Sequence, residues 1–261
     1  MSVFLYNNVE IGYVPPTPVQ PNFESSLLYY AKQTLLQYAA KFGHPISYIQ
    51  EQQGSLIQNI IPVQNTEKQQ ISTSSKVELG LHTETAFHPY KPDYIMLLCL
   101  RGDHKAATTY ANLSDILNQL DVNTRRVLKQ KWFTTGIDLS FRTSNEPDQE
   151  ISISIVGELD GMLTLTYDEL LIKGTNDLAN EALEKVNQAV KNCTQEIVLK
   201  TGDLLVLDNK KTIHGRKPFQ ARYDGTDRWV QRMLIRKTLP PKKFLLDNNI
   251  INVELKDMVN Q

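Results

Sequence analysis

Residues 79–101 read LGLHTETAFHPYKPDYIMLLCLR, and the function of the whole chain is interpreted from this stretch outward. The apolar run from Tyr94 to Leu100 predicts a buried strand, and the residues before it predict another. Because side chains alternate along a strand, His82 and Glu84 are predicted to project from the same side, roughly 6.5–7 Å apart. Gly80 lies on that side too and leaves room beside them. An imidazole and a carboxylate placed in this way supply two ligands on one face of an octahedral metal ion.

His214 is the candidate for a third ligand. It follows residues 201–209, TGDLLVLDN, which predict a turn and an apolar strand that ends in a polar loop. Two histidines and one carboxylate leave three coordination positions open, and a non-haem iron(II) oxygenase needs these for a bidentate cosubstrate and O2. The same three ligands also suit a zinc-dependent hydrolase, and His214 alone is more often a loop or capping residue than a ligand.

Two arginines give the metal hypothesis its weight. Arg228 and Arg232 lie in the run RWVQRML, and on a strand they face the same way, roughly 13 Å apart. Cations on a largely apolar strand are costly unless each meets an anion. A guanidinium matches a carboxylate bidentately, so each arginine is predicted either to bind a carboxylate ligand or to form an internal salt bridge.

Residues 82–101 closely resemble the block HTE-x-AF-x-PYRPDY-x-x-LLCLR of the clavaminate synthase-like iron(II)/2-oxoglutarate oxygenases. That family includes hydroxylases of free arginine, asparagine and lysine. Further matches are the EQQG of residues 51–54, Gly202-Asp203, and the HGR of residues 214–216. The similarity spans roughly residues 50–236, most of the chain.

The resemblance implies a role for each matching residue. It makes His82, Glu84 and His214 the catalytic iron ligands. The cosubstrate 2-oxoglutarate would hold its distal carboxylate on Arg228 and Thr108, with adjacent Thr109 as the fallback. For an amino-acid substrate, the matches are Arg232 for the α-carboxylate, Gln52 and Ser72 for the amino-acid head, and Asp168 for a basic tail.

The predicted fold is mainly β with helical additions, a double-stranded β-helix of the jelly-roll, cupin-like type. One domain over residues 1–261 is expected, with an extended Pro-rich arm at 1–22 and the jelly-roll core at about 50–237. Helices are predicted at Glu24–Phe42, at Leu113–Trp132 with Ser114 as the N-cap, and at Asn176–Lys191. Strands are predicted at Ser55–Val63, Val77–Glu84, Tyr94–Leu100, Ile151–Val156, Met162–Tyr167, Asp203–Asp208 and Arg228–Lys237. Residues 143–150 are predicted to be a lid or a plain surface loop.

Composition excludes several classes of function. The formal net charge is −1, which argues against nucleic acid as a partner, because such proteins need a basic surplus. Two cysteines, Cys99 and Cys193, are too few for a disulfide framework and favour a cytoplasmic setting. No run approaches the roughly 18 apolar residues of a membrane span. The oligomeric state stays open.

The expected activity is hydroxylation of an unactivated C–H bond of a free L-amino acid, with Fe(II), 2-oxoglutarate and O2. An acidic residue at 168 favours lysine or arginine as substrate. Glu84 stands where the family's halogenases have glycine, which favours hydroxylation over halogenation. Desaturation, a carrier-bound or peptide substrate, a zinc hydrolase and a non-catalytic cupin-like binding module remain open alternatives.

Overall fold

The computed structural model describes residues 2–138, 141 and 149–254. A seven-stranded sheet forms its largest layer and is antiparallel except where β16 pairs with β2. The strand order is β1-β13-β5-β15-β2-β16, and β3 also pairs with β15. The bounds are β1 Val3–Tyr6, β13 Leu204–Asp208, β5 Tyr94–Arg101, β15 Trp229–Arg236, β2 His44–Tyr48, β16 Ile250–Ile251 and β3 Gln58–Ile60.

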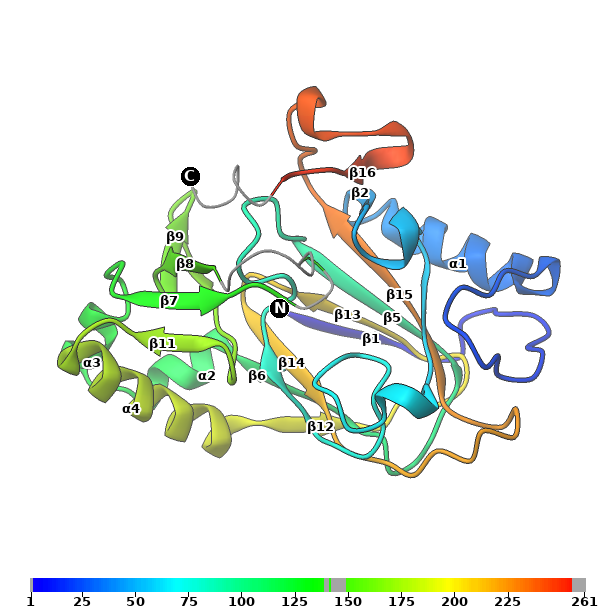
Figure 1. Cartoon of the computed structure of the whole chain (residues 1–261), viewed down its shortest axis with the longest axis horizontal. Helices are drawn as coiled ribbons and strands as arrows, with labels where there is room; N and C mark the ends of the chain where they lie inside the picture. Colours follow the sequence, from blue (N-terminus) through cyan, green and yellow to red (C-terminus); the bar gives the residue numbers. More distant parts are fainter. Residues whose placement is uncertain (1, 139–140, 142–148, 255–261) are drawn as a thin grey trace.

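A second sheet of four strands lies beside the first (Figure 1) and carries most of the polar residues of interest. Its order is β12-β6-β14-β4, all antiparallel. The bounds are β12 Gln195–Ile197, β6 Thr108–Asn112, β14 Thr212–Arg216 and β4 Leu79–His82. Two sheets joined by long crossings are the expected double-stranded β-helix.

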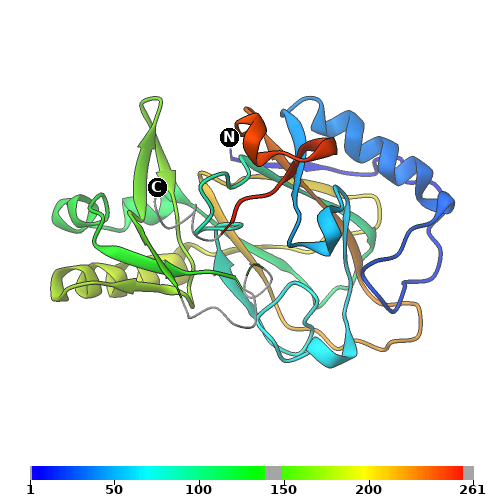
Figure 2. The ribbon, with the colours of Figure 1, turned by 45° about the horizontal axis from the view of Figure 1, so that its top comes forward.

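Both faces of strand β5 are buried against apolar side chains. Met96, Leu98 and Leu100 belong to a cluster formed with α1 (Tyr29–Ala39), whereas Ile95, Leu97 and Cys99 belong to another cluster. The alternation follows from the two-residue period of a strand. Helix α1 therefore covers the outer face of the large sheet, as Figures 1 and 2 show, and leaves the inner face toward the four-stranded sheet.

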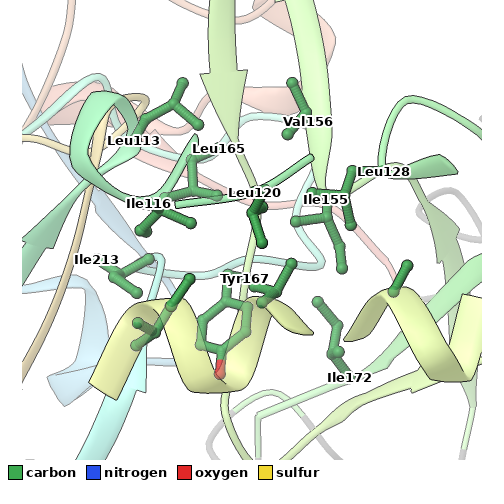
Figure 3. Packing of buried hydrophobic residues seen from close by; sticks show 14 of the residues in the cluster. Leu113, Ile116, Leu120, Leu128, Ile155, Val156, Leu165, Tyr167, Ile172 and Ile213 are labelled. Atoms are coloured by element: carbon green, nitrogen blue, oxygen red, sulfur yellow. The ribbon is translucent and has the colours of Figure 1, made fainter. Parts of the chain in front are cut away.

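A lobe is inserted between β6 and β12, and Figure 3 shows side chains of its own apolar cluster. Ile155, Leu165 and Tyr167 are buried in this cluster beside helix α4, and the Tyr167 hydroxyl donates to Asn187 Oδ1 at 2.8 Å. The cluster anchors the chain that leads into Asp168. The lobe consists of α2 Leu113–Asn118, α3 Val122–Val127, β7 Phe133–Gly136, β8 Glu150–Ile153, β9 Val156–Leu159, β10 Met162–Leu165, β11 Ile172–Gly174 and α4 Asp177–Cys193.

The helix predictions were right in place but not always in length. Helix α4, predicted over Asn176–Lys191, spans Asp177–Cys193 with Asn176 as its N-cap. The first helix is shorter than predicted and starts with a 3-10 turn at Ser26–Leu28. The single helix predicted over Leu113–Trp132 was wrong: it is two short helices, because Asp121 caps a new one by accepting from the Thr124 backbone N–H. Ser114 lies inside α2 rather than at its cap.

Three points of the strand assignment needed correction. The predicted N-terminal arm contains strand β1, paired with β13 at the edge of the large sheet. His214 lies within β14, not in a loop after a strand, and Glu84 lies beyond the end of β4. Of the residues predicted as a lid, 143–148 lie outside the described part. No helix among the described residues is long and apolar enough to cross a membrane.

Candidate metal and anion site

The two candidate histidines face each other across neighbouring strands. His82 ends β4, His214 lies in β14, and the two residues are direct cross-strand partners with ring centroids 4.5 Å apart. The Nδ1 of His82 lies 2.8 Å from the Gly80 carbonyl oxygen and donates to it, so Nε2 is the nitrogen left for a metal. Burial and the neighbouring His82 lower the pKa of His214, which favours the neutral imidazole that binds metals.

Glu84 completes a three-residue cluster. Ligand atoms of His82, Glu84 and His214 all lie within 4.8 Å of one another. Although Glu84 follows the strand instead of continuing it, its carboxylate still converges on the histidines, with Oε2 3.4 Å from Nε2 of His214. Burial alone would raise the pKa of Glu84, but Arg232 and the two imidazoles outweigh it and hold the pKa below its usual range. The group is thus an anion, as a ligand for a divalent cation must be.

Arg232 is tied to carboxylates on both sides. Its Nη1 donates to Glu84 Oε1 at 2.6 Å, and its Nη2 donates to Glu51 Oε2 at 3.0 Å. Gln58 Oε1 accepts from Nε at 2.8 Å and from Nη2 as well. Burial would lower the pKa of Arg232, but the two carboxylates raise it. Because Arg232 occupies Oε1 of Glu84, Oε2 is the oxygen left for a metal.

Arg228 has the opposite surroundings. It is buried, yet its side chain makes no hydrogen bond or ion pair with any residue in the described part of the chain. Burial lowers the pKa of Arg228. Burial and the nearby Arg228 also lower the pKa of Arg216 to about 10. Two buried guanidiniums that repel each other are costly without a counter-charge, so this site favours binding of an anion.

The strand register identifies which threonine shares this site. His214 pairs with Tyr110 and Arg216 pairs with Thr108, so Thr108 lies on the same face of the sheet as both. Thr109 points to the opposite face. The Thr108 hydroxyl is buried and has no partner among the described residues. A carboxylate placed between Arg228 and Thr108 would satisfy both groups.

The two residues predicted for the substrate head are less well placed. Gln52 directs its side-chain amide to the Asn59 carbonyl oxygen at 3.2 Å rather than toward Arg232. Ser72 is half-buried, and its side chain makes no hydrogen bond within the described residues. The neighbouring Glu51, which was not predicted as a site residue, has its carboxylate 3.0 Å from Arg232 Nη2.

Asp168 lies next to the metal cluster. It forms an isolated β-bridge with His82, and its Oδ1 accepts from the backbone of Leu170 and Leu171, both at 2.9 Å. A further acid, Asp138, is close enough for its pKa to respond to His82, Asp168, Glu84 and Glu51. Burial and repulsion by these carboxylates, against the effect of His82, raise the pKa of Asp138 to about 7. This residue was missed, because nothing in its sequence neighbourhood marks it.

Three kinds of comparison with known proteins agree with this geometry. The model of the taurine catabolism dioxygenase TauD, TfdA family matches residues 163–234. An enduracididine beta-hydroxylase of Streptomyces hygroscopicus is 32% identical over 222 residues, covering 76% of this chain and 64% of the relative. An L-lysine 3-hydroxylase of Catenulispora acidiphila is 33% identical over 197 residues, covering 74% of this chain and 55% of the relative.

Solved structures agree over nearly the whole chain. An asparagine oxygenase in complex with Fe(II), 2S,3S-3-hydroxyasparagine and succinate has a TM-score of 0.88 at 28% identity and covers 97% of this chain and 80% of that one. The iron oxygenase OrfP with Fe and alpha-ketoglutaric acid has a TM-score of 0.86 at 27% identity and covers 97% of this chain and 80% of that one. The chain belongs to the clavaminate synthase-like iron oxygenases. Family and fold are as the sequence predicted.

The family's cofactors fit the residues that the fold brings together. Two imidazoles and a carboxylate suit iron(II), and the unpartnered Arg228 and Thr108 suit a carboxylate of 2-oxoglutarate. The chain spans 64% and 55% of the lengths of the two relatives compared above.

Proposed function

We propose that this chain is an iron(II)- and 2-oxoglutarate-dependent oxygenase that hydroxylates a free L-amino acid with a basic side chain. The observation that carries the proposal is the pair of buried groups Arg228 and the Thr108 hydroxyl, both without a hydrogen-bond partner among the described residues, in a fold that also brings His82, Glu84 and His214 together. A zinc hydrolase would use the cluster alone and leave a buried cation without a partner, at a cost in stability.

Each group has a task in this proposal. His82, Glu84 and His214 hold the metal, and Arg228 with Thr108 fixes the distal carboxylate of the cosubstrate. When bound, iron(II) with 2-oxoglutarate and O2 supplies the oxidising power that breaks an unactivated C–H bond. The protein's own contribution is to orient the substrate and exclude water.

The pair Arg232 and Glu51 suits the zwitterionic head of an amino acid. Without substrate, Glu51 neutralises part of the Arg232 charge across 3.0 Å. An amino acid brings an α-carboxylate that replaces Glu51 on Arg232, and an α-ammonium that gives Glu51 a new partner. The exchange leaves Arg232 and Glu51 each paired with an opposite charge in the buried site, which an isolated carboxylate or amine would not do.

Asp168 and Asp138 favour a cationic tail. Both acids lie near His82, one through a β-bridge and the other through its electrostatic effect. Asp168 Oδ1 is occupied by two backbone N–H groups, so its second oxygen is the one offered to a ligand. A lysine ammonium or an arginine guanidinium would relieve the repulsion between the two carboxylates.

The test is reconstitution of the metal-free protein under anaerobic conditions with Fe(II) and 2-oxoglutarate, followed by air and a panel of L-amino acids. The expected result is a visible charge-transfer band of the chelate, then succinate and a product heavier by one oxygen from lysine or arginine. Asp168→Asn should reduce kcat/KM for the basic substrate about 10- to 100-fold, since a charged hydrogen bond contributes roughly 1.5–3 kcal/mol. Asp160→Asn, in the exposed β9–β10 turn, is the matched control.

Two outcomes would contradict the proposal. The absence of a band together with tight zinc retention and hydrolase activity would replace the oxygenase by the zinc enzyme. A band with turnover of a neutral amino acid only, unaffected by Asp168→Asn, would keep the oxygenase and reject the basic substrate.

A further inference from the structure

The backbone that carries Glu84 needs support from outside its own strand. Strand β4 ends at His82, so no ladder of the four-stranded sheet reaches Glu84. Thr83 still pairs with Tyr167, through a backbone bond of 2.7 Å and a hydroxyl that accepts at 3.1 Å. One residue after Glu84, Thr85 has a left-handed φ of 48°, so the chain turns sharply at the candidate ligand.

Asn209 supplies that support. Its Oδ1 accepts from the Glu84 backbone N–H at 2.8 Å, and its Nδ2 donates to the Glu84 carbonyl oxygen at 3.2 Å. The same Nδ2 donates to the Pro92 carbonyl oxygen at 3.0 Å. The side chain thereby imitates a neighbouring strand, because it satisfies both backbone groups of one residue. Its own backbone N–H donates to the Asp93 carbonyl oxygen at 2.9 Å, which fixes the asparagine in turn.

The position of Asn209 links two of the three candidate ligands. It lies between β13 and β14, five residues before His214 (214 − 209), so one connection places His214 directly and Glu84 through the asparagine. Arg232 also holds Glu84, but only through the carboxylate oxygen Oε1. Arg232 therefore fixes one end of the side chain, and Asn209 fixes the backbone from which that side chain starts.

We propose that Asn209 is the positioning residue that sets the geometry of Glu84 as a metal ligand. The inference rests on the metal role proposed above for the three-residue cluster. Outer hydrogen bonds that orient a ligand typically change metal affinity 10- to 100-fold when they are removed. Here the oriented group is a peptide unit, so its loss lets the whole Glu84 residue move.

A purely structural role is the alternative, and the chain offers a matched control. Asn59 is also buried and also uses its full side chain: Nδ2 donates to the Pro21 and Phe23 carbonyl oxygens, and Oδ1 accepts from Trp229 Nε1 and Gln231 Nε2. None of these partners is a candidate metal ligand. Asn59→Ala should therefore destabilise the protein about as much as Asn209→Ala without the same effect on the metal.

The experiment titrates full-length, metal-free protein with Co(II), a probe whose d–d absorption reports ligand geometry, alongside thermal unfolding. We expect Asn209→Ala to weaken Co(II) binding about 10- to 100-fold and to change the d–d spectrum. Asn59→Ala should bind Co(II) with an affinity within threefold of wild type and should give the wild-type d–d spectrum. Asn209→Asp keeps the side-chain volume and the acceptor for the Glu84 N–H but loses both hydrogen bonds that Nδ2 donates. Its Co(II) affinity should therefore lie between those of wild type and Asn209→Ala. It replaces the alanine variant if that variant does not fold.

The proposal is overturned if the Asn209 variant binds Co(II) with wild-type affinity and spectrum. It is also overturned if Asn59→Ala weakens Co(II) binding to the same degree for an equal loss in Tm. If wild-type protein itself gives no Co(II) spectrum, the metal role of the cluster fails instead, so the two ideas are tested separately.

Discussion

Replacing Arg228 with methionine should separate stability from cosubstrate binding. The guanidinium is buried, without a hydrogen bond or ion pair to any described residue, and burial lowers its pKa, so its charge opposes folding in the ligand-free protein. Methionine has a similar length and no charge, and the metal-free variant should be at least as stable as wild type. When 2-oxoglutarate binds, the lost guanidinium leaves a buried carboxylate without its partner, which costs about 3–5 kcal/mol. At 1.4 kcal/mol per tenfold, this is a loss of roughly 140- to 3700-fold in affinity.

The assay is an anaerobic titration of the Fe(II)-loaded protein with 2-oxoglutarate, read from the charge-transfer band, together with Tm of the metal-free form. Arg126→Met, at an exposed position of α3, is the control and should change neither value. The reasoning is refuted if Arg228→Met binds 2-oxoglutarate within threefold of wild type. It is equally refuted if the variant loses several degrees in Tm, since Arg228 would then have a stabilising partner within the protein.

Three further predictions follow from the same site. Thr108→Val should weaken 2-oxoglutarate binding about 10- to 100-fold in the titration above, because a hydrogen bond to a charged group contributes roughly 1.5–3 kcal/mol, whereas Thr109→Val on the opposite face should not. Glu51→Gln should raise KM for the amino acid at least tenfold in a coupled succinate assay and leave the affinity for 2-oxoglutarate unchanged. If the substitution weakens binding of the amino acid and of 2-oxoglutarate equally, Glu51 does not bind the substrate's amino group specifically. The pKa of Asp138 is raised to about 7, so the folded state keeps a proton that the unfolded state loses near pH 4, and stability falls as the pH rises toward 7. Urea unfolding of metal-free protein from pH 4 to pH 8 should show this fall in wild type and not in Asp138→Asn.

Sequence patterns predicted the strands that are apolar throughout and missed those that are short or polar. Tyr94–Leu100 matches β5 almost residue for residue, because such a run buries both faces. Strands β6 and β14, with sequences TTYAN and TIHGR, carry few apolar residues, since the face that they share holds site residues. A strand that builds a polar site cannot show the apolar alternation by which strands are recognised.

The candidate site could be predicted only where residues lie in recognisable blocks. His82, Glu84, His214, Arg228 and Thr108 were named from spacing and resemblance, and the fold brings the first three within 4.8 Å. Glu51 was not predicted, although its neighbour Gln52 was. Gln52 has a left-handed φ of 41° and its side-chain amide donates to the Asn59 carbonyl oxygen, whereas the Glu51 carboxylate pairs with Arg232. Asp138 and Asn209 give no sequence signal, because their roles depend on Glu84, which lies 54 and 125 positions away (138 − 84 and 209 − 84), through an electrostatic effect for Asp138 and a hydrogen bond for Asn209.

Arg232 in β15 and Arg228, the residue just before that strand, explain why the two ligands should bind in a fixed order. Arg232 already has Glu84 and Glu51 as partners, so an amino acid gains only the difference between its own contacts and those that it displaces. Arg228 has no such partner among the described residues, and with Arg216 nearby it repels a second cation, so an anion gains nearly the full interaction. The cosubstrate pocket is therefore ready to bind before the substrate pocket is. We expect 2-oxoglutarate to bind the Fe(II)-loaded protein tightly without amino acid, whereas the amino acid alone should bind weakly. Calorimetric titrations in both orders will measure this, and tight binding of the amino acid alone would show that Glu51 does not compete for Arg232.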